Sequence, residues 1–169
     1  MEFFELIKER RSIRDFKDIE VNDDLIKKVI EAGMYAPTGT NSQDTYFTAI
    51  KNKELLEELR FIGNKILTRQ NFFYNPNVLI LVSYGPKAKT GLSDVSCAME
   101  NMMLAATDLG LSSVWINQLL DNENQLLKEF YKKIQIPEDH KVCVALALGY
   151  PNQSPRDITR NLTNYRIIK

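Results

Sequence analysis

The chain has 169 residues and a mass of 19.5 kDa, and 44% of the residues are hydrophobic and 26% are charged. This length and composition suit a single domain over residues 1–169 and exclude a multidomain assembly or a disordered chain. The 22 basic and 22 acidic side chains cancel, so no net field draws the protein toward nucleic acid or anionic lipid.

In the first half of the chain the apolar spacing predicts a short helix, a second helix, a polar loop, a strand, a helical segment and a central strand, over residues 3–10, 23–35, 37–43, 45–51, 52–73 and 78–82. In the second half it predicts a long buried helix, a strand, a helix and a last strand, over residues 94–109, 113–117, 122–134 and 142–148. The predicted N-caps are Asn22 or Asp23, Ser93 or Asp94, and Asp121.

This alternation of helices and strands ordinarily favours a parallel doubly wound sheet. However, no strand is followed by the glycine-rich turn of a nucleotide-binding unit. The pattern alone therefore predicts a mixed α and β fold and leaves the strand directions open. Residues 152–169 form a tail with no evident surface of their own domain to pack on.

The few cysteine and histidine residues and the lack of long apolar runs argue against several kinds of site and segment. Cys97 and Cys143 lie among apolar neighbours outside any paired motif, so we expect neither a disulfide scaffold nor a metal site. His140, the one histidine, follows a Pro-Glu-Asp turn and is expected to be exposed, so we expect no catalytic triad, two-histidine metal site or histidine relay. No apolar run approaches the roughly 18 residues of a membrane span, and the N-terminal stretch is too charged for a signal peptide. We therefore expect a cytoplasmic protein that binds neither membrane nor nucleic acid.

The strongest local signal is a cluster of three guanidinium groups and a hydroxyl at Arg10, Arg11, Ser12 and Arg14. Guanidinium forks donate paired hydrogen bonds to phosphate oxygens, and a serine hydroxyl adds another donor. The alternative is a solvated helix end. Contact with nucleic acid is a weaker interpretation, because no further basic or aromatic patch extends the cluster.

A second signal is the polar loop, residues 37–43, which combines small residues with the amides of Asn41 and Gln43. Amides can bind the mixed donor and acceptor edge of a heterocycle, because each offers both an NH2 group and a carbonyl. An ordinary surface loop is the alternative.

Taken together, segments in this order and spacing resemble the FMN-dependent nitroreductase family in its compact single-domain branch: Arg10 to Phe16, Ala36 to Gln43, Asp94 to Asn117, and Ala147 to Pro151. The resemblance spans nearly the whole chain. It implies an α+β sandwich with helices flanking a mainly antiparallel sheet. It also implies a homodimer with FMN at the subunit interface, in which the tail 152–169 crosses to the partner.

The same resemblance implies which residues hold FMN. Arg10, Arg11 and Ser12 are expected to bind the phosphate and ribityl chain, and Arg14 the pyrimidine edge. The loop is expected to reach the flavin of the other subunit through Pro37, Thr38, Gly39, Asn41 and Gln43.

Two further groups of contacts are implied nearer the C-terminus. Trp115, Ile116 and Asn117 are expected beside the flavin ring. The family's Lys-x-Arg pair falls on Ile158 and Arg160, so Arg160 is retained and the lysine is missing. Whether Arg156 replaces that charge is left open.

By this resemblance the protein is an NAD(P)H oxidoreductase. It would pass hydride through the flavin N5 in a ping-pong cycle, from NADH or NADPH to nitroaromatics, quinones or similar flat acceptors. No catalytic side chain and no metal is then needed. Two alternatives stay open: a flavin-binding or regulatory dimer without turnover, and a related flavin-dependent reductive dehalogenase.

Two smaller expectations concern other residues. Phe61, Phe72, Phe73 and Tyr74 fall in a segment, residues 61–75, that forms a variable lid in the family, and they are expected to shape the acceptor pocket. Glu100, in the long helix, is expected to face a gap or the dimer partner rather than to act in catalysis.

Overall fold

The computed structural model describes residues 2–67, 70–118 and 123–169. Four strands form one sheet in the order β1-β2-β4-β3, and every neighbouring pair is antiparallel. Their bounds are Thr45–Ile50 for β1, Val78–Tyr84 for β2, Ser112–Ile116 for β3 and Lys141–Gly149 for β4. The mainly antiparallel α+β fold that the family resemblance implies is therefore confirmed.

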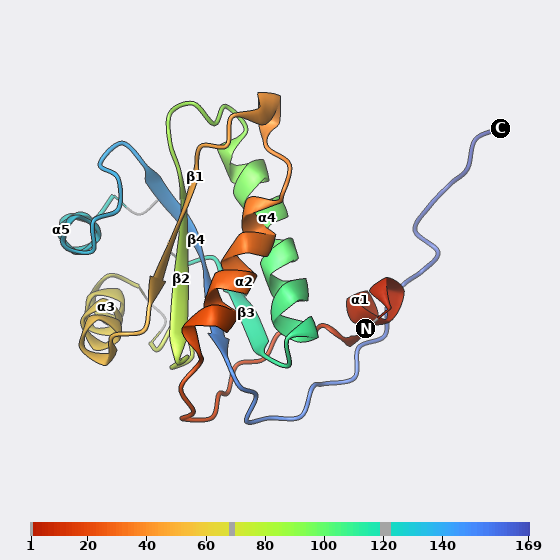
Figure 1. Ribbon diagram of the computed structural model, residues 1–169, viewed down its shortest axis with the longest axis horizontal. Helices are drawn as coiled ribbons and strands as arrows, with labels where there is room; N and C mark the ends of the chain where they lie inside the picture. The colour runs from red at the N-terminus through yellow and green to blue at the C-terminus, as the bar shows by residue number, and fades with distance from the viewer. Residues whose placement is uncertain (1, 68–69, 119–122) are drawn as a thin grey trace.

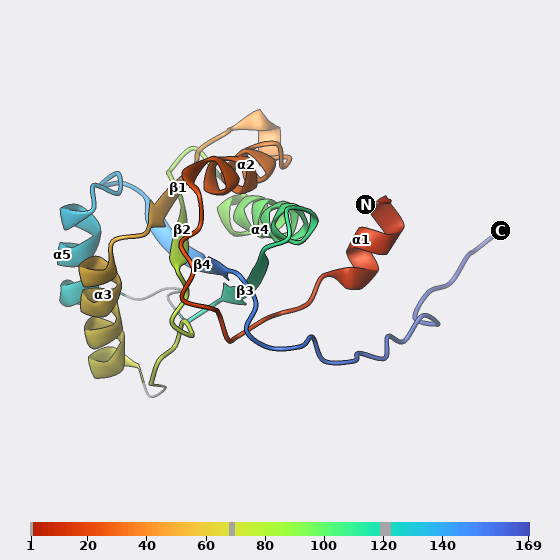
Figure 2. The same ribbon diagram turned by 60° about the horizontal axis from the view of Figure 1, so that its bottom comes forward.

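Helices cover both faces of the sheet (Figure 1, Figure 2). Helices α2 (Asp23–Met34) and α4 (Gly91–Asp108) lie on one face, and α3 (Lys53–Ile66) and α5 (Gln125–Lys133) lie on the other. The short helix α1 (Phe3–Glu9) lies beyond α4, away from the sheet. None of the helices that the structure describes is both long and apolar enough to cross a lipid bilayer.

The central strand β2 explains why the layers hold together. Val78, Ile80 and Val82 pack into the cluster under α2 and α4, whereas Leu79 and Leu81 pack into the cluster under α3 and α5. Alternate side chains of a strand point to opposite faces, so an uninterrupted apolar run fills two cores at once. Each fully buried side chain of this kind contributes about 1.5–3 kcal/mol.

The predicted helix over 52–73 is too long. Helix α3 ends at Ile66, and the chain returns so that Phe72 and Phe73 are completely buried against it. A Cβ atom on Gly63 would come within 2.0 Å of the Phe72 ring, so only glycine allows this close approach. Asn71 has a positive φ of 48°, which marks the reversal.

Two of the predicted N-caps need correction. Asn22 caps α2 through a 2.8 Å bond from the Asp24 amide, as expected. Asn124 caps α5, while Asp121 lies outside the described residues. Helix α4 begins earlier than predicted, after Thr90, and neither Ser93 nor Asp94 is its N-cap.

His140 is not exposed as predicted. Only 10% of its side chain is accessible, and its Nδ1 atom lies 3.2 Å from the Ser83 hydroxyl. Its Nε2 atom lies 3.6 Å from the carboxylate of Asp44. Ser83 is 2% exposed, so this Asp-His-Ser row is closed to a substrate and acts as a link between strands.

Most of the tail lies apart from the body of its own chain, as expected. From residue 154 every residue is exposed, and the chain runs beneath α1 and away from the sheet (Figure 1, Figure 2). Its large apolar side chains are therefore presented to solvent in the single chain: Ile158, Leu162, Tyr165, Ile167 and Ile168.

Candidate functional site

The arginine cluster, Arg10 to Arg14, is fixed to the edge of the sheet. Ser12 forms a parallel bridge with Ser113 of β3, and the amide of Ile13 donates to the Ser113 carbonyl at 3.0 Å. Ile13 is 3% exposed, so its side chain anchors the segment in the core. The neighbours of a buried residue in an extended segment point the other way, which turns Ser12 and Arg14 away from the core.

Arg10 lies beside a carboxylate of helix α4. Its Nε atom lies 3.4 Å from the Glu100 carboxylate on α4, and its side chain is 18% exposed. Glu100 is 49% exposed in the single chain, so it does not face an internal gap, and the alternative that it faces the dimer partner stays a prediction. Within the described residues, Arg10 is the member of the cluster that pairs with a carboxylate. The cluster therefore keeps an excess of positive charge.

Arg11 ties the cluster to the tail. Its Nη1 atom donates to the carbonyls of Lys8 and Arg10, and its Nε atom donates to the carbonyl of Arg156 at 3.3 Å. The tail thus passes beside the predicted phosphate-binding residues. Arg156 meets the cluster through its backbone, and Arg160 lies four residues further on in the exposed tail.

Arg14 lies over an aromatic ring. Its guanidinium carbon is 5.7 Å from the centroid of the Tyr74 ring, and its Nη1 atom donates to the Ser12 carbonyl at 3.4 Å. A planar cation stacked in this way is held in place while its edges stay free to donate. Tyr74, one of the expected lid residues, thus serves the arginine cluster.

The other aromatic residues of the expected lid divide into two groups. Phe72 and Phe73 are completely buried, so the expectation that they shape an acceptor pocket is wrong. Phe61 is 61% exposed, and Lys65 lies over its ring at 4.2 Å. Burial of the pair follows from apolar packing beneath α3, which the composition of the segment could not distinguish from a lid.

The bridge at Ser113 joins the cluster to the strand that carries Trp115 and Ile116 and that precedes Asn117. Trp115 and Ile116 end the strand and Asn117 follows it, exposed. The hydroxyl of Ser113 and the Nε1 atom of Trp115 are buried and have no hydrogen-bond partner in the described part of the chain. Buried donors of this kind are normally satisfied by a ligand or by water.

The polar loop lies far from the cluster in the single chain. It stands at the N-terminal end of α4, whereas α1 and the cluster lie toward the other end of that helix (Figure 1, Figure 2). One subunit thus attaches the arginine cluster to the strand that carries Trp115 and Ile116, but not to the loop.

The loop backbone is unusual. Thr40, Asn41 and Gln43 have positive φ values of 54°, 54° and 49°. Each non-glycine residue in this region costs about 1–3 kcal/mol and persists only where neighbouring groups hold it. Internal bonds supply part of that support, since the Gln43 amide donates to the Thr38 hydroxyl and its side chain donates to Asn41.

Two carboxylates lie beside this loop, and the sequence predicted a site role for neither of them. Asp94 is only 3% exposed and accepts from the Gly39 amide at 3.0 Å. Asp44, directly after the loop, accepts from the Lys87 amide at 2.8 Å. The acidic residue Asp94 among the apolar residues of the long helix could have indicated a contact with another segment. The same pattern is equally typical of a helix N-cap.

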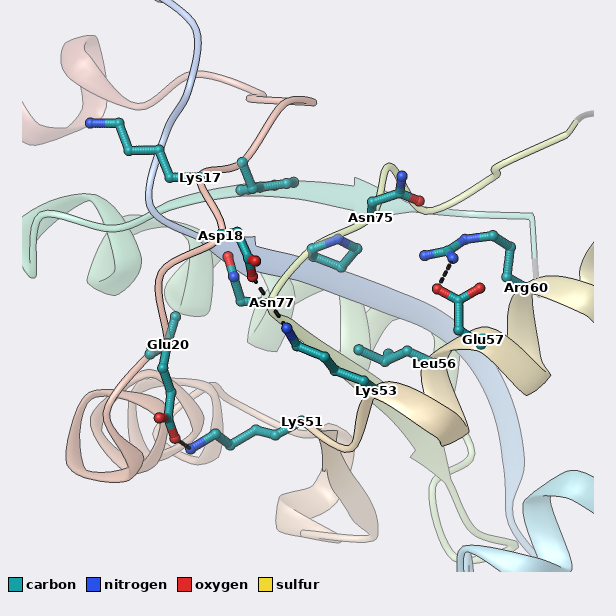
Figure 3. A pocket seen from close by; sticks show the side chains of 13 residues that line it. Lys17, Asp18, Glu20, Lys51, Lys53, Leu56, Glu57, Arg60, Asn75 and Asn77 are labelled. Atoms are coloured by element: carbon teal, nitrogen blue, oxygen red, sulfur yellow. Dashed lines mark hydrogen bonds and ion pairs between the residues drawn. The ribbon is translucent and has the colours of Figure 1, made fainter.

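A cavity of about 740 Å3 lies elsewhere, between residues 16–21, the start of α3 and residues 75–77 (Figure 3). Six of its charged side chains form three pairs, Lys51 with Glu20, Lys53 with Asp18, and Arg60 with Glu57, and Lys17 also lines it. The cavity includes none of the predicted flavin-binding residues. A flavin site that lies between two subunits would not form a closed cavity in a single chain.

Lys51 also pairs with Asp23 at the start of α2. The distance from its Nζ atom to the carboxylate is 2.6 Å, and this hydrogen bond lowers the pKa of Asp23 below its ordinary value. The same contact raises the pKa of Lys51. The pair ties α2 to the end of β1 and is structural rather than part of the arginine cluster.

Comparison with known proteins accounts for this arrangement. The sequence model of the Nitroreductase family matches residues 7–62 and 60–150. A candidate NADH dehydrogenase/NAD(P)H nitroreductase of Archaeoglobus fulgidus is 32% identical over 155 residues, which are 89% of this chain and 86% of that protein.

Solved structures agree. A nitroreductase with bound FMN from Bacteroides fragilis superposes with a TM-score of 0.91 at 32% identity over 100% of both chains. A nitroreductase with bound FMN from Desulfitobacterium hafniense superposes with a TM-score of 0.85 at 25% identity over 98% of this chain and 97% of the other. The chain therefore belongs to the Nitroreductase family.

Proposed function

We propose that this protein is an FMN-dependent oxidoreductase that takes electrons from NADH or NADPH. The observation that carries the proposal is the arginine cluster, fixed to the edge strand β3 by the bridge between Ser12 and Ser113. Its guanidinium groups suit the phosphate of FMN, since forks of paired N–H donors match phosphate oxygens. The FMN bound to the Bacteroides fragilis and Desulfitobacterium hafniense relatives supports the choice of cofactor.

The side chains of this chain have binding and orienting roles in the proposal. Arg10, Arg11 and Ser12 hold the phosphate and ribityl chain, and Arg14, stacked on Tyr74, faces the pyrimidine edge. Bound FMN supplies the hydride chemistry between NAD(P)H and flat acceptors such as nitroaromatics or quinones. No side chain of this chain is assigned to acid or base catalysis.

The proposal includes a homodimer of single FMN-binding domains, residues 1–169. The distance between the polar loop and the arginine cluster within one chain supports it, because Pro37 to Gln43 can then contact the flavin of the other subunit. The exposed apolar side chains of the tail support it too, since burying them on a partner is favourable. Arg160 would reach the phosphate from this tail.

The test is a near-ultraviolet and visible absorbance spectrum of the purified protein, followed by anaerobic addition of NADH and then NADPH. We expect a flavin spectrum that bleaches with at least one nucleotide, and steady-state oxidation of that nucleotide when a quinone is supplied. A protein that stays colourless after incubation with FMN would overturn the cofactor assignment. A bound flavin that neither nucleotide reduces would leave a flavin-binding protein without this activity.

A further inference from the structure

The polar loop is joined to the turn between β2 and α4, residues 85–90, by two carboxylates. On one side the Gly39 amide and the Thr90 hydroxyl both donate to Oδ1 of Asp94, at 3.0 and 2.9 Å. On the other side the Lys87 amide donates to Oδ2 of Asp44 at 2.8 Å, and the Gly85 amide donates to the Asp44 carbonyl at 2.9 Å. The loop is therefore held at both ends.

Of the two carboxylates, Asp94 is the one that is buried and incompletely hydrogen-bonded. It is 3% exposed, and its second oxygen, Oδ2, is buried with no hydrogen-bond partner among the described residues. A carboxylate held in this way is costly, and its place in the first turn of α4 offsets part of the cost through the helix dipole. The two hydrogen bonds that it accepts come from Gly39 in the loop and from Thr90, the residue before the helix.

The contact at Gly39 leaves no spare room. A Cβ atom on this residue would come within 2.0 Å of the Thr90 hydroxyl, so the loop backbone lies directly against the turn. Three loop residues beyond it, Thr40, Asn41 and Gln43, have positive φ values. Backbone in this conformation needs support from outside the loop, and Asp94 is placed where that support is needed.

We infer that Asp94 is a positioning residue for FMN. By fixing Gly39 against Thr90 it holds Asn41 and Gln43 in the conformation that contacts the flavin of the other subunit. The inference rests on the proposed function, because it takes the loop as part of the FMN site. Preorganising a binding loop improves affinity by removing the cost of ordering it when the ligand binds.

The test compares Asp94→Ala with Asp94→Asn by titrating the apoprotein with FMN and following quenching of flavin fluorescence. Asparagine keeps an oxygen that accepts both bonds, so we expect FMN affinity within about twofold of the wild type. Alanine removes both bonds, and we expect about a tenfold loss of affinity. The visible circular dichroism of the bound flavin should change in the alanine variant only.

A second pair of variants tests the same link if Asp94→Ala folds poorly. Thr90→Ser keeps the hydroxyl that donates to Asp94, whereas Thr90→Val removes it at nearly constant volume. We expect Thr90→Val to weaken FMN binding and Thr90→Ser to leave it unchanged. Asn101→Ala is the matched control, because it removes a bond from α4 to the Ala32 carbonyl of α2, away from the loop. It should lower Tm without changing FMN affinity.

The outcomes separate this inference from the proposed function. If the wild type binds no FMN, the proposed function fails first. If the wild type binds FMN, and folded Asp94→Ala and Thr90→Val bind it equally well with the same circular dichroism, the positioning role is wrong while the proposed function stands. An equal loss of affinity in Asn101→Ala would reduce the effect to general destabilisation and would also overturn the inference.

Discussion

The Nε atom of Arg10 lies 3.4 Å from the carboxylate of Glu100, so helix α4 supplies a counter-charge to the arginine cluster. The pair joins a mostly buried cation to a half-exposed anion, and ion pairs that are partly open to solvent contribute about 0–1 kcal/mol to stability. Its larger consequence concerns ligands, because a carboxylate at this position repels an approaching phosphate.

We expect Glu100→Gln to bind FMN about threefold more tightly than the wild type, since the variant removes that repulsion and leaves Arg10 in place. Titration of the apoprotein at low ionic strength measures the change, which added salt should reduce. Glu58→Gln is the matched control, because Glu58 pairs with Lys133 on the opposite side of the sheet. Weaker binding by Glu100→Gln would instead mean that Glu100 orients Arg10 for the ligand.

Removal of the cluster should have a much larger effect. We expect the double variant Arg10→Ala and Ser12→Ala to lose about a hundredfold in FMN affinity, because charge-assisted bonds contribute about 1.5–3 kcal/mol each. Equilibrium dialysis against FMN gives the value, and Lys8→Ala, an exposed cation on the neighbouring helix, is the control. If the double variant retains flavin as well as the wild type, the assignment of Arg10 and Ser12 to the FMN phosphate is wrong.

Tyr131 offers a stabilising substitution. Its hydroxyl is buried without a hydrogen-bond partner among the described residues, and burial raises the pKa of Tyr131 well above its ordinary value. We expect Tyr131→Phe to raise the free energy of unfolding by about 1 kcal/mol, because it removes an unsatisfied group. Urea denaturation measures this change.

The same substitution should alter the response to alkali. A raised folded pKa means that the wild type loses stability as the pH rises through the ordinary tyrosine value of 10.0, where the unfolded chain ionises first. Phenylalanine cannot ionise, so the advantage of Tyr131→Phe should grow above that pH. An advantage that is constant with pH would contradict the burial of this hydroxyl.

The pair of Lys51 and Asp23 predicts a dependence at the acid end. Because Lys51 lowers the pKa of Asp23 below 3.8, the pair stabilises the fold above that ordinary value, and the stabilisation is lost as the pH falls through the lower folded value. We expect Lys51→Met to lower Tm near neutral pH and to match the wild type in strong acid. Lys53→Met is the control, since its contact with Asp18 is longer, at 3.4 Å, and exposed. A difference in Tm that persists in acid would contradict the role of this carboxylate.

The sequence pattern predicts where helices and strands lie better than it predicts how they pair and pack. Short apolar runs located the strands within a few residues, because the strands β2 and β4 are buried along almost their whole length. It left the direction of the strands open, since pairing depends on contacts between segments far apart, such as Ile50 with Leu79. The boundary at Ile66 was missed because Phe72 and Phe73 are equally suited to a helix face and to a buried turn.

In the candidate site too, residues close together in the sequence were easier to predict than contacts between distant segments. Ser12 and the arginines were predictable because their chemistry is concentrated in a short run of sequence. Asp94 and Gly39 were not linked, because they lie on different elements and their contact arises only when the loop packs against α4. Burial of His140 was missed for the same reason, as it depends on Ser83 and Asp44 from two other segments.

The strand order has a consequence for how the chain folds. Strand β4 lies between β2 and β3, although both precede it in the sequence. Until β4 enters the sheet, β2 has one unpaired edge, and its side chains are apolar on both faces. An open apolar edge is a template for pairing with another copy of the chain. Because non-local sheets close slowly, we expect the refolding yield to fall as the protein concentration rises. The arginine cluster gains its support on β3 only as that sheet closes.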